Sequence, residues 1–140
     1  MADGAFVWAD TTDADFVSAV TNQFAVRATG GVLLNAGTNN LELASGGIKV
    51  TGAGVGTATP VFVHKATPAN TTAHYTTITN PHSDNNPGAL LFVSHNWNQD
   101  NLSETHPLGV FYNSGHWAIY HEDGVSMPVG AAFNVIVIKP

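Results

Sequence analysis

Short runs of β-branched and aromatic residues fill residues 60–140 and alternate with turns that contain Asn, Pro, Ser and Gly. Runs of this length bounded by turn residues are typical of strands. The Asn-Ser-Gly sequence at 113–115 predicts a tight hairpin between two of them. We therefore expect an all-β domain, a compact antiparallel sandwich or barrel, with strands at 60–66, 74–79, 89–95, 108–112, 116–121 and 131–138.

Two of these runs predict which residues form the core. The run from Leu90 to Val93 is entirely apolar, so we expect that strand to be buried on both faces. Trp117 and Ile119 alternate along another strand, which places both on the face that packs against the core. Phe133 is expected to join them from the last strand.

Charge and composition exclude several classes of protein. Charged residues make up 10% of the chain, Lys and Arg number four, and the net charge is −6. Because phosphate backbones require clustered basic residues, we expect no nucleic-acid binding. No apolar run is long enough to cross a membrane, so we expect no membrane insertion, and the start of the chain does not read as a signal peptide. The absence of Cys excludes disulfides and thiolate chemistry.

The two halves of the chain differ in composition near residue 60. All seven His and all seven Pro follow that point, whereas nine of the fourteen Gly precede it. We therefore expect an N-terminal segment at 1–59 and a C-terminal head at 60–140, joined by a flexible Gly-rich linker at 51–59.

The N-terminal segment contains an internal repeat. Residues 28–35 match residues 44–51, and each copy is typical of a small-residue turn followed by a short strand. Two such units cannot bury a core within one chain. We therefore expect a homotrimer in which the segment forms a short intertwined β stalk, with these apolar residues at the interchain core: Val32, Leu34, Ile48 and Val50.

Two resemblances accompany this reading. Residues 4–10 (GAFVWAD), 15–16 (DF) and 22–32 (NQFAVRATGGV) resemble a segment common in large bacterial surface proteins and phage tail-fibre-like proteins, which implies trimeric β-rich stalk material. From about residue 61 to 137, the chain resembles a family of small bacterial β-rich domains of uncharacterised function that occur in secreted multi-module proteins. That resemblance rests on the sequences ATPANTT (66–72), NWN (96–98), HPLGVFY (106–112), GHWAI (115–119) and MPVGAAFNV (127–135). It implies a binding or adhesion role, and members often have Arg where this chain has His116.

The aromatic residues indicate a candidate ligand site. Trp97 lies among Asn, Gln and Asp residues after the expected end of a strand, where an indole can stack on a sugar face while amides bind its hydroxyls. The alternative is that Trp97 folds back over the edge of the core. We expect Tyr112 and His116 to line one polar face, with Tyr120 further along it. The predicted ligand-binding residues are Asn96, Trp97, Asn98, Asp100, Tyr112 and His116.

Metal and catalytic sites receive less support. His116 and His121 point to opposite faces of a regular strand and cannot bind one ion together. A site assembled from His95, His106 and His121 stays open as a weak candidate, and we expect no cofactor. The sequence contains no nucleophile elbow and no phosphate loop, so we expect no enzyme.

The sequence favours a non-catalytic, lectin-like or adhesin-like protein of a cell surface or virion, whose trimer binds a cell-surface glycan. One alternative is a purely structural module that caps a trimer. A second is an enzyme with a His-lined metal site.

Overall fold

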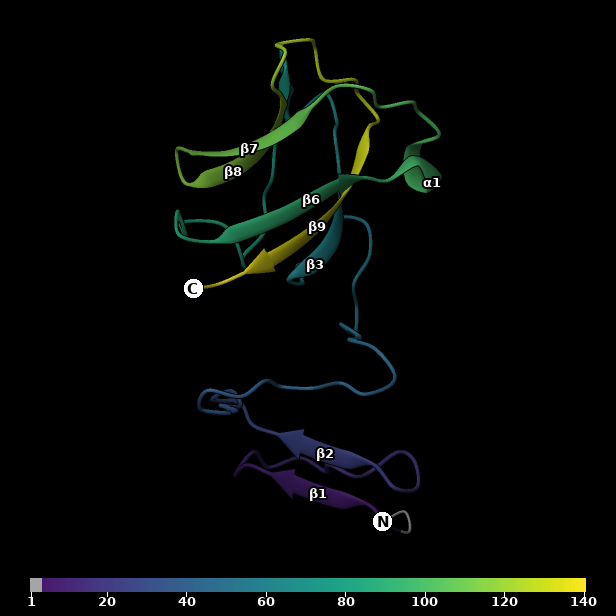
Figure 1. Ribbon diagram of the computed structural model, residues 1–140, viewed down its shortest axis with the longest axis vertical. Coiled ribbons are helices and arrows are strands. Elements are labelled where there is room, and N and C mark those ends of the chain that lie inside the picture. The colour runs from purple at the N-terminus through teal and green to yellow at the C-terminus, as the bar shows by residue number, and fades with distance from the viewer. Residues whose placement is uncertain (1–3) are drawn as a thin grey trace. The chain divides into compact units, whose positions relative to one another are not determined.

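The computed structural model describes residues 4–140 and is built almost entirely of β-strands (Figure 1). The described residues form two compact units that divide between Gly47 and Ile48. No helix in the described part of the chain is long and apolar enough to cross a membrane. The first unit contains β1 (Phe6–Ala9) and β2 (Phe24–Arg27). The second contains β3 (Val61–Lys65), β4 (Thr71–Thr72), β5 (Tyr75–Thr77), β6 (Leu90–His95), α1 (Trp97–Asp100), β7 (Leu108–Asn113), β8 (His116–His121) and β9 (Ala132–Ile138).

The first unit is organised around a parallel pair of strands. β1 pairs with β2, and the opposed rings of Phe6 and Phe24 stack with their centroids 5.1 Å apart. At the ends of these strands, Asp10 accepts a hydrogen bond from Arg27 Nε at 3.2 Å. Hydrogen bonds from Thr12 and Thr29 hold the pKa of Asp10 well below its ordinary value. A charged clamp therefore closes this pair, although few buried side chains support it.

The internal repeat does not form strands in this chain. A turn occurs at 29–30 as expected and a bend at 45–46, but the residues that follow them make no β-ladder. Val32 and Ile48 are exposed there. An extended segment needs a neighbouring strand to pair its backbone groups, and the described residues of one chain supply none.

The second unit is a sandwich-like pair of antiparallel sheets. One sheet has the strand order β3-β9-β6 and the other β4-β5-β8-β7. All six predicted strands are present, and residues 113–116 join β7 to β8 as the predicted hairpin. The short strand β4 was not predicted, and no closed barrel forms among residues 4–140. The prediction of an all-β, sandwich-like fold for residues 60–140 is therefore confirmed.

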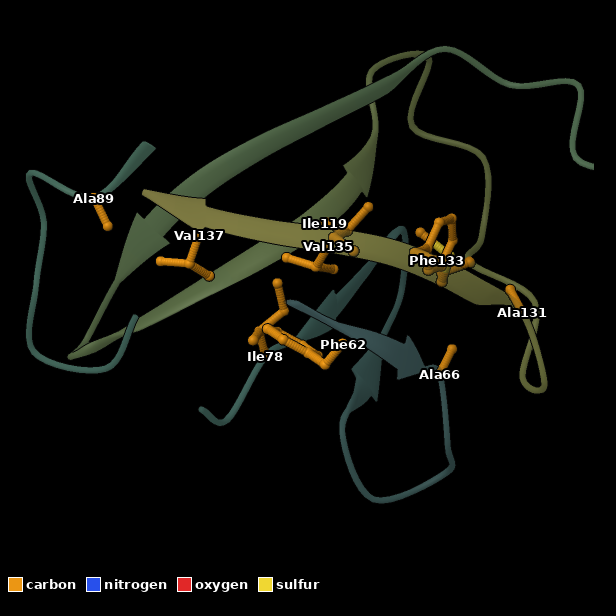
Figure 2. Packing of buried hydrophobic residues seen from close by; sticks show 10 residues of the cluster. Phe62, Ala66, Ile78, Ala89, Ile119, Ala131, Phe133, Val135 and Val137 are labelled. Atoms are coloured by element: carbon orange, nitrogen blue, oxygen red, sulfur yellow. The ribbon is translucent and has the colours of Figure 1, made fainter. Parts of the chain in front are cut away.

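The core lies between the two sheets. Phe62 and Val135 are directly paired in one sheet, and Ile119 faces them from the other (Figure 2). Phe133 and Ile78 are completely buried in the same cluster. Trp117 is half-buried against it and donates its indole N–H to a backbone carbonyl at 3.0 Å. The predicted orientation of Trp117 and Ile119 toward the core is confirmed.

The prediction for β6 is wrong on one face. Leu91 and Val93 pack against the core, but Leu90 and Phe92 are 58% and 59% exposed. The reason is that the unit has only two layers, so the other sheet covers just one face of the β3-β9-β6 sheet. The outer face of this sheet is therefore partly apolar.

Residues 51–59, expected as a flexible linker, are held against the second unit instead. Val63 donates its N–H to Gly54 O at 2.9 Å and accepts the N–H of Gly56 at 2.9 Å. The Asn80 side chain donates to the carbonyls of Thr57 and Thr59. These bonds explain why the second unit begins earlier than the expected boundary at residue 60. A high Gly content predicts a flexible backbone, but long-range hydrogen bonds restrict the backbone here.

Candidate functional site

Trp97 opens the one-turn helix α1, immediately after β6. Asn101 ends the turn in the left-handed conformation, with φ of 58°, and donates its N–H to Trp97 O at 2.7 Å. The indole is 55% exposed and lies outside the core cluster. Trp97 therefore presents an apolar surface to solvent, as a stacking platform requires, although the short helix was not predicted.

Asp100 has a different role from the one expected for it. Its side chain is fully buried, and it accepts hydrogen bonds from His95 at 2.8 Å, from Leu102 N–H at 2.9 Å and from Ala132 N–H at 2.7 Å. Burial raises the pKa of Asp100, but these hydrogen bonds outweigh it and leave the pKa below its ordinary value. Asp100 therefore anchors α1 to β6 and β9 and has no surface to offer a ligand.

A row of polar side chains continues from Trp97 onto the outer face of the β3-β9-β6 sheet. Asn96 donates to Asn134 Oδ1 at 2.7 Å, and Asn134 donates to Ser94 Oγ at 3.2 Å. Within residues 4–140, Asn96 Oδ1 has no hydrogen-bond partner. Asn98 is exposed one residue after Trp97. Asn134 was missed by the sequence analysis because it is distant in sequence from Asn96. Ser94 was assigned only to the preceding strand.

Tyr112 and His116 lie at the other end of the second unit. The β7–β8 hairpin ends there, far from α1 (Figure 1). The expectation that they share a face is wrong, because Tyr112 pairs with Trp117 across the hairpin and so lies on the face opposite His116. His116 instead pairs with Asp84, with Nδ1 and Oδ1 3.1 Å apart. The structure therefore does not bring the six predicted residues into one site.

The three candidate metal ligands separate into two places. His95 is engaged with Asp100 beside α1. His106 and His121 come together with their rings stacked, centroids 4.8 Å apart, and Asp123 lies next to them. The side chain of His121 is fully buried.

A pocket of about 360 Å³ lies beside β3, lined by residues that include Gly56, Phe62, Lys65 and Asn70. His64 borders it and is neutral, because burial lowers its pKa to about 4. Its Nε2 lies 2.8 Å from Thr76 Oγ1, whose proton goes to Asn70 Oδ1 at 3.1 Å. His64 Nε2 therefore donates to Thr76, and Nδ1 carries the lone pair. Sequence reasoning gave no signal for this residue beyond its place in a strand.

An aromatic patch on the outer face of the other sheet was also missed. Tyr75, Phe111 and Tyr120 meet edge to face, with centroid distances of 5.4 Å and 5.5 Å. Tyr120 lies so close over Gly109 that a Cβ there would be 2.4 Å from the ring. Strand parity assigns Phe111 to this face, but an apolar residue is ordinarily expected in the core.

These features define an all-β, sandwich-like domain with an exposed tryptophan, a buried histidine pocket and a histidine–carboxylate cluster. Residues 49–137 match the model of a family described as a domain of unknown function (DUF7452), and the chain belongs to this family. The match agrees with the resemblance of the C-terminal half to a family of small uncharacterised domains, and it does not reach residues 4–32. No curated protein and no solved structure matches the chain.

Proposed function

We propose that the protein is a non-catalytic glycan-binding protein of a bacterial or virion surface, which acts as a homotrimer. Its second unit binds sugar through Trp97 and the amides beside it. The exposed indole of Trp97, held on an anchored turn, is the observation that carries this proposal.

The surroundings of Trp97 suit a sugar. A saccharide offers apolar C–H faces together with hydroxyls that both donate and accept hydrogen bonds, so it needs an aromatic face and nearby amides. Trp97 supplies the ring, and Asn96, Asn98 and Asn134 supply amide groups on the same end of the sheet. Because Asp100 fixes the turn internally, little conformational entropy is lost when a ligand stacks on it.

The first unit supports the oligomer. Phe24 is 73% exposed, and Phe6 and Trp8 are also exposed on a sheet of only two strands. Such a pair is marginally stable alone, and apolar surface of this extent marks a protein interface. A second and a third copy of the same segment would cover it and supply the missing neighbours for the repeat at 28–35 and 44–51.

A trimer would also compensate for the weak affinity of each single site. One shallow stacking site with few hydrogen bonds gives about millimolar binding, roughly −4 kcal/mol. Three sites that engage one dense glycan surface raise the apparent affinity by avidity.

The glycan site is tested on an array of immobilised glycans with the full chain. Trp97→Ala should abolish binding, whereas Trp97→Tyr, which keeps a stacking ring, should retain part of it. Circular dichroism and the measured mass must match the parent in both variants. If Trp97→Ala binds every glycan as the parent does, the site is wrong. If the parent binds none, the proposed function is wrong and a structural role in capping a trimer is favoured.

The assembly is tested separately by light scattering. The parent should have about three times the chain mass of 14.6 kDa. Phe24→Asp places a charge on the exposed apolar face and should lower the mass. A monomer mass for the parent at micromolar concentration contradicts the trimer.

A further inference from the structure

Two histidines and two carboxylates converge at one edge of the second unit. Glu104 and His106 come from the segment between α1 and β7, His121 ends β8, and Asp123 lies in the turn that follows. One ligand atom from each of His106, His121 and Asp123 lies within 4.8 Å of the others. Glu104 is not part of that group of three, but its Oε2 lies 3.0 Å from His121 Nε2, which makes it the candidate for a fourth donor.

The hydrogen bonds of His121 define which of its nitrogens can bind a cation. Nδ1 lies 2.9 Å from the backbone carbonyl of Val125, which can only accept, so Nδ1 carries the proton. In the neutral ring, Nε2 then presents a lone pair directly to a Glu104 carboxylate oxygen, which also presents a lone pair. Both side chains are nearly inaccessible, with exposures of 0% and 4%. Two acceptors cannot face each other at this distance unaided, so either a proton on Nε2, which donates to Glu104, or a metal ion bound by both residues must lie between them.

No Lys or Arg within residues 4–140 forms an ion pair with these two carboxylates. The ion pairs recorded for Glu104 and Asp123 are with His121 and His106 only, and the His106 Nδ1 to Asp123 Oδ2 distance is 2.6 Å. The group holds two carboxylates, and their charge is balanced either by one proton on each imidazole or by a single divalent cation.

The chemistry of the donors selects the metal. Two imidazole nitrogens and two carboxylate oxygens suit Zn²⁺, which prefers four ligands in a tetrahedron. Donors about 2.1 Å from such an ion lie about 3.4 Å apart. The atoms of His106, His121 and Asp123, which lie within 4.8 Å of one another, would therefore have to draw closer when the ion binds, and Glu104 would have to join them. The bond from His121 Nδ1 to Val125 O is the outer contact that commonly orients a metal-binding histidine.

We propose that Glu104, His106, His121 and Asp123 form a structural binding site for one Zn²⁺ ion per chain. Four protein ligands complete a tetrahedral shell and leave no position for a substrate. The ion would therefore stabilise the fold and would not take part in catalysis. The ion ties the segment after α1 to the end of β8.

The experiment uses the full chain purified without a histidine tag and stripped with EDTA. Titration calorimetry with Zn²⁺ should show one ion per chain, and Co²⁺ should give the intense visible absorption of four-coordinate cobalt. Thermal unfolding should shift upward when Zn²⁺ is added. Binding without the four-coordinate Co²⁺ spectrum, or at a stoichiometry well below one, overturns the site.

Two variants at half-exposed positions keep the test independent of folding. Asp123→Asn and His106→Gln should each weaken Zn²⁺ binding roughly tenfold or more. His116→Gln is the matched control, because it breaks a second half-exposed histidine–aspartate pair, with Asp84, away from the cluster. Binding that both variants retain in full, or that the control loses equally, overturns the proposal. The measurement involves no glycan, so its outcome is independent of the proposed function.

Discussion

His64 makes the stability of the second unit depend on pH. The residue is buried on the inner face of β3 and donates through Nε2 to Thr76. Burial lowers its pKa from 6.5 to about 4, so the folded chain keeps the ring neutral while the unfolded chain protonates it at mildly acidic pH. Because the unfolded state binds more protons in this range, the free energy of unfolding falls as pH falls from about 6.5 toward about 4.

The magnitude follows from the difference between the two pKa values. Each unit by which folding lowers a pKa corresponds to about 1.4 kcal/mol of free energy between the charged and neutral forms. The difference between 6.5 and about 4 therefore amounts to about 3 kcal/mol of the free energy of unfolding. This stability is lost progressively as the pH falls through that range, and no more of it is lost below about pH 4. This is a large part of the roughly 5–15 kcal/mol that stabilises an ordinary domain.

The assay is urea unfolding followed by tryptophan fluorescence at several pH values between 7 and 4. His64→Gln keeps a side-chain N–H in reach of Thr76 and removes the titration. We expect the parent to lose about 3 kcal/mol more than His64→Gln across this range. His82→Gln is the control and should lose stability as the parent does. Equal losses in the parent and His64→Gln would refute the reasoning, since they would show that the buried ring does not resist protonation.

Three further variants test the packing. Trp117→Ala should cost about 2–3 kcal/mol, below the usual range for a fully buried aromatic because the indole is only half-buried; a loss under about 1 kcal/mol in urea unfolding would show that the strand faces are inverted. Gly109→Ala should displace the ring of Tyr120 and cost about 1–3 kcal/mol, with a change in near-ultraviolet circular dichroism, and an unaltered spectrum would contradict the close contact. Asp10→Asn should weaken the clamp with Arg27 and speed hydrogen exchange in the first unit alone; unchanged exchange there would show that the clamp does not stabilise the strand pair.

The positions of the main strands could be read from the sequence. The runs that form β3, β6, β7, β8 and β9 are bounded by turn residues, and the hairpin at 113–116 follows from local turn chemistry. Parity within one strand also placed Trp117 and Ile119 correctly. These properties are local, because the chain conformation over a few residues decides them.

The arrangement of the sites required the tertiary structure. Whether Phe92 is buried depends on how many layers cover its sheet, and the face that Tyr112 occupies depends on its register with β8. The pairing of His121 with Glu104, and of Asn96 with Asn134, joins residues far apart along the chain. A sequence pattern specifies which residues can bind a ligand or an ion, but only long-range pairing decides which of them meet.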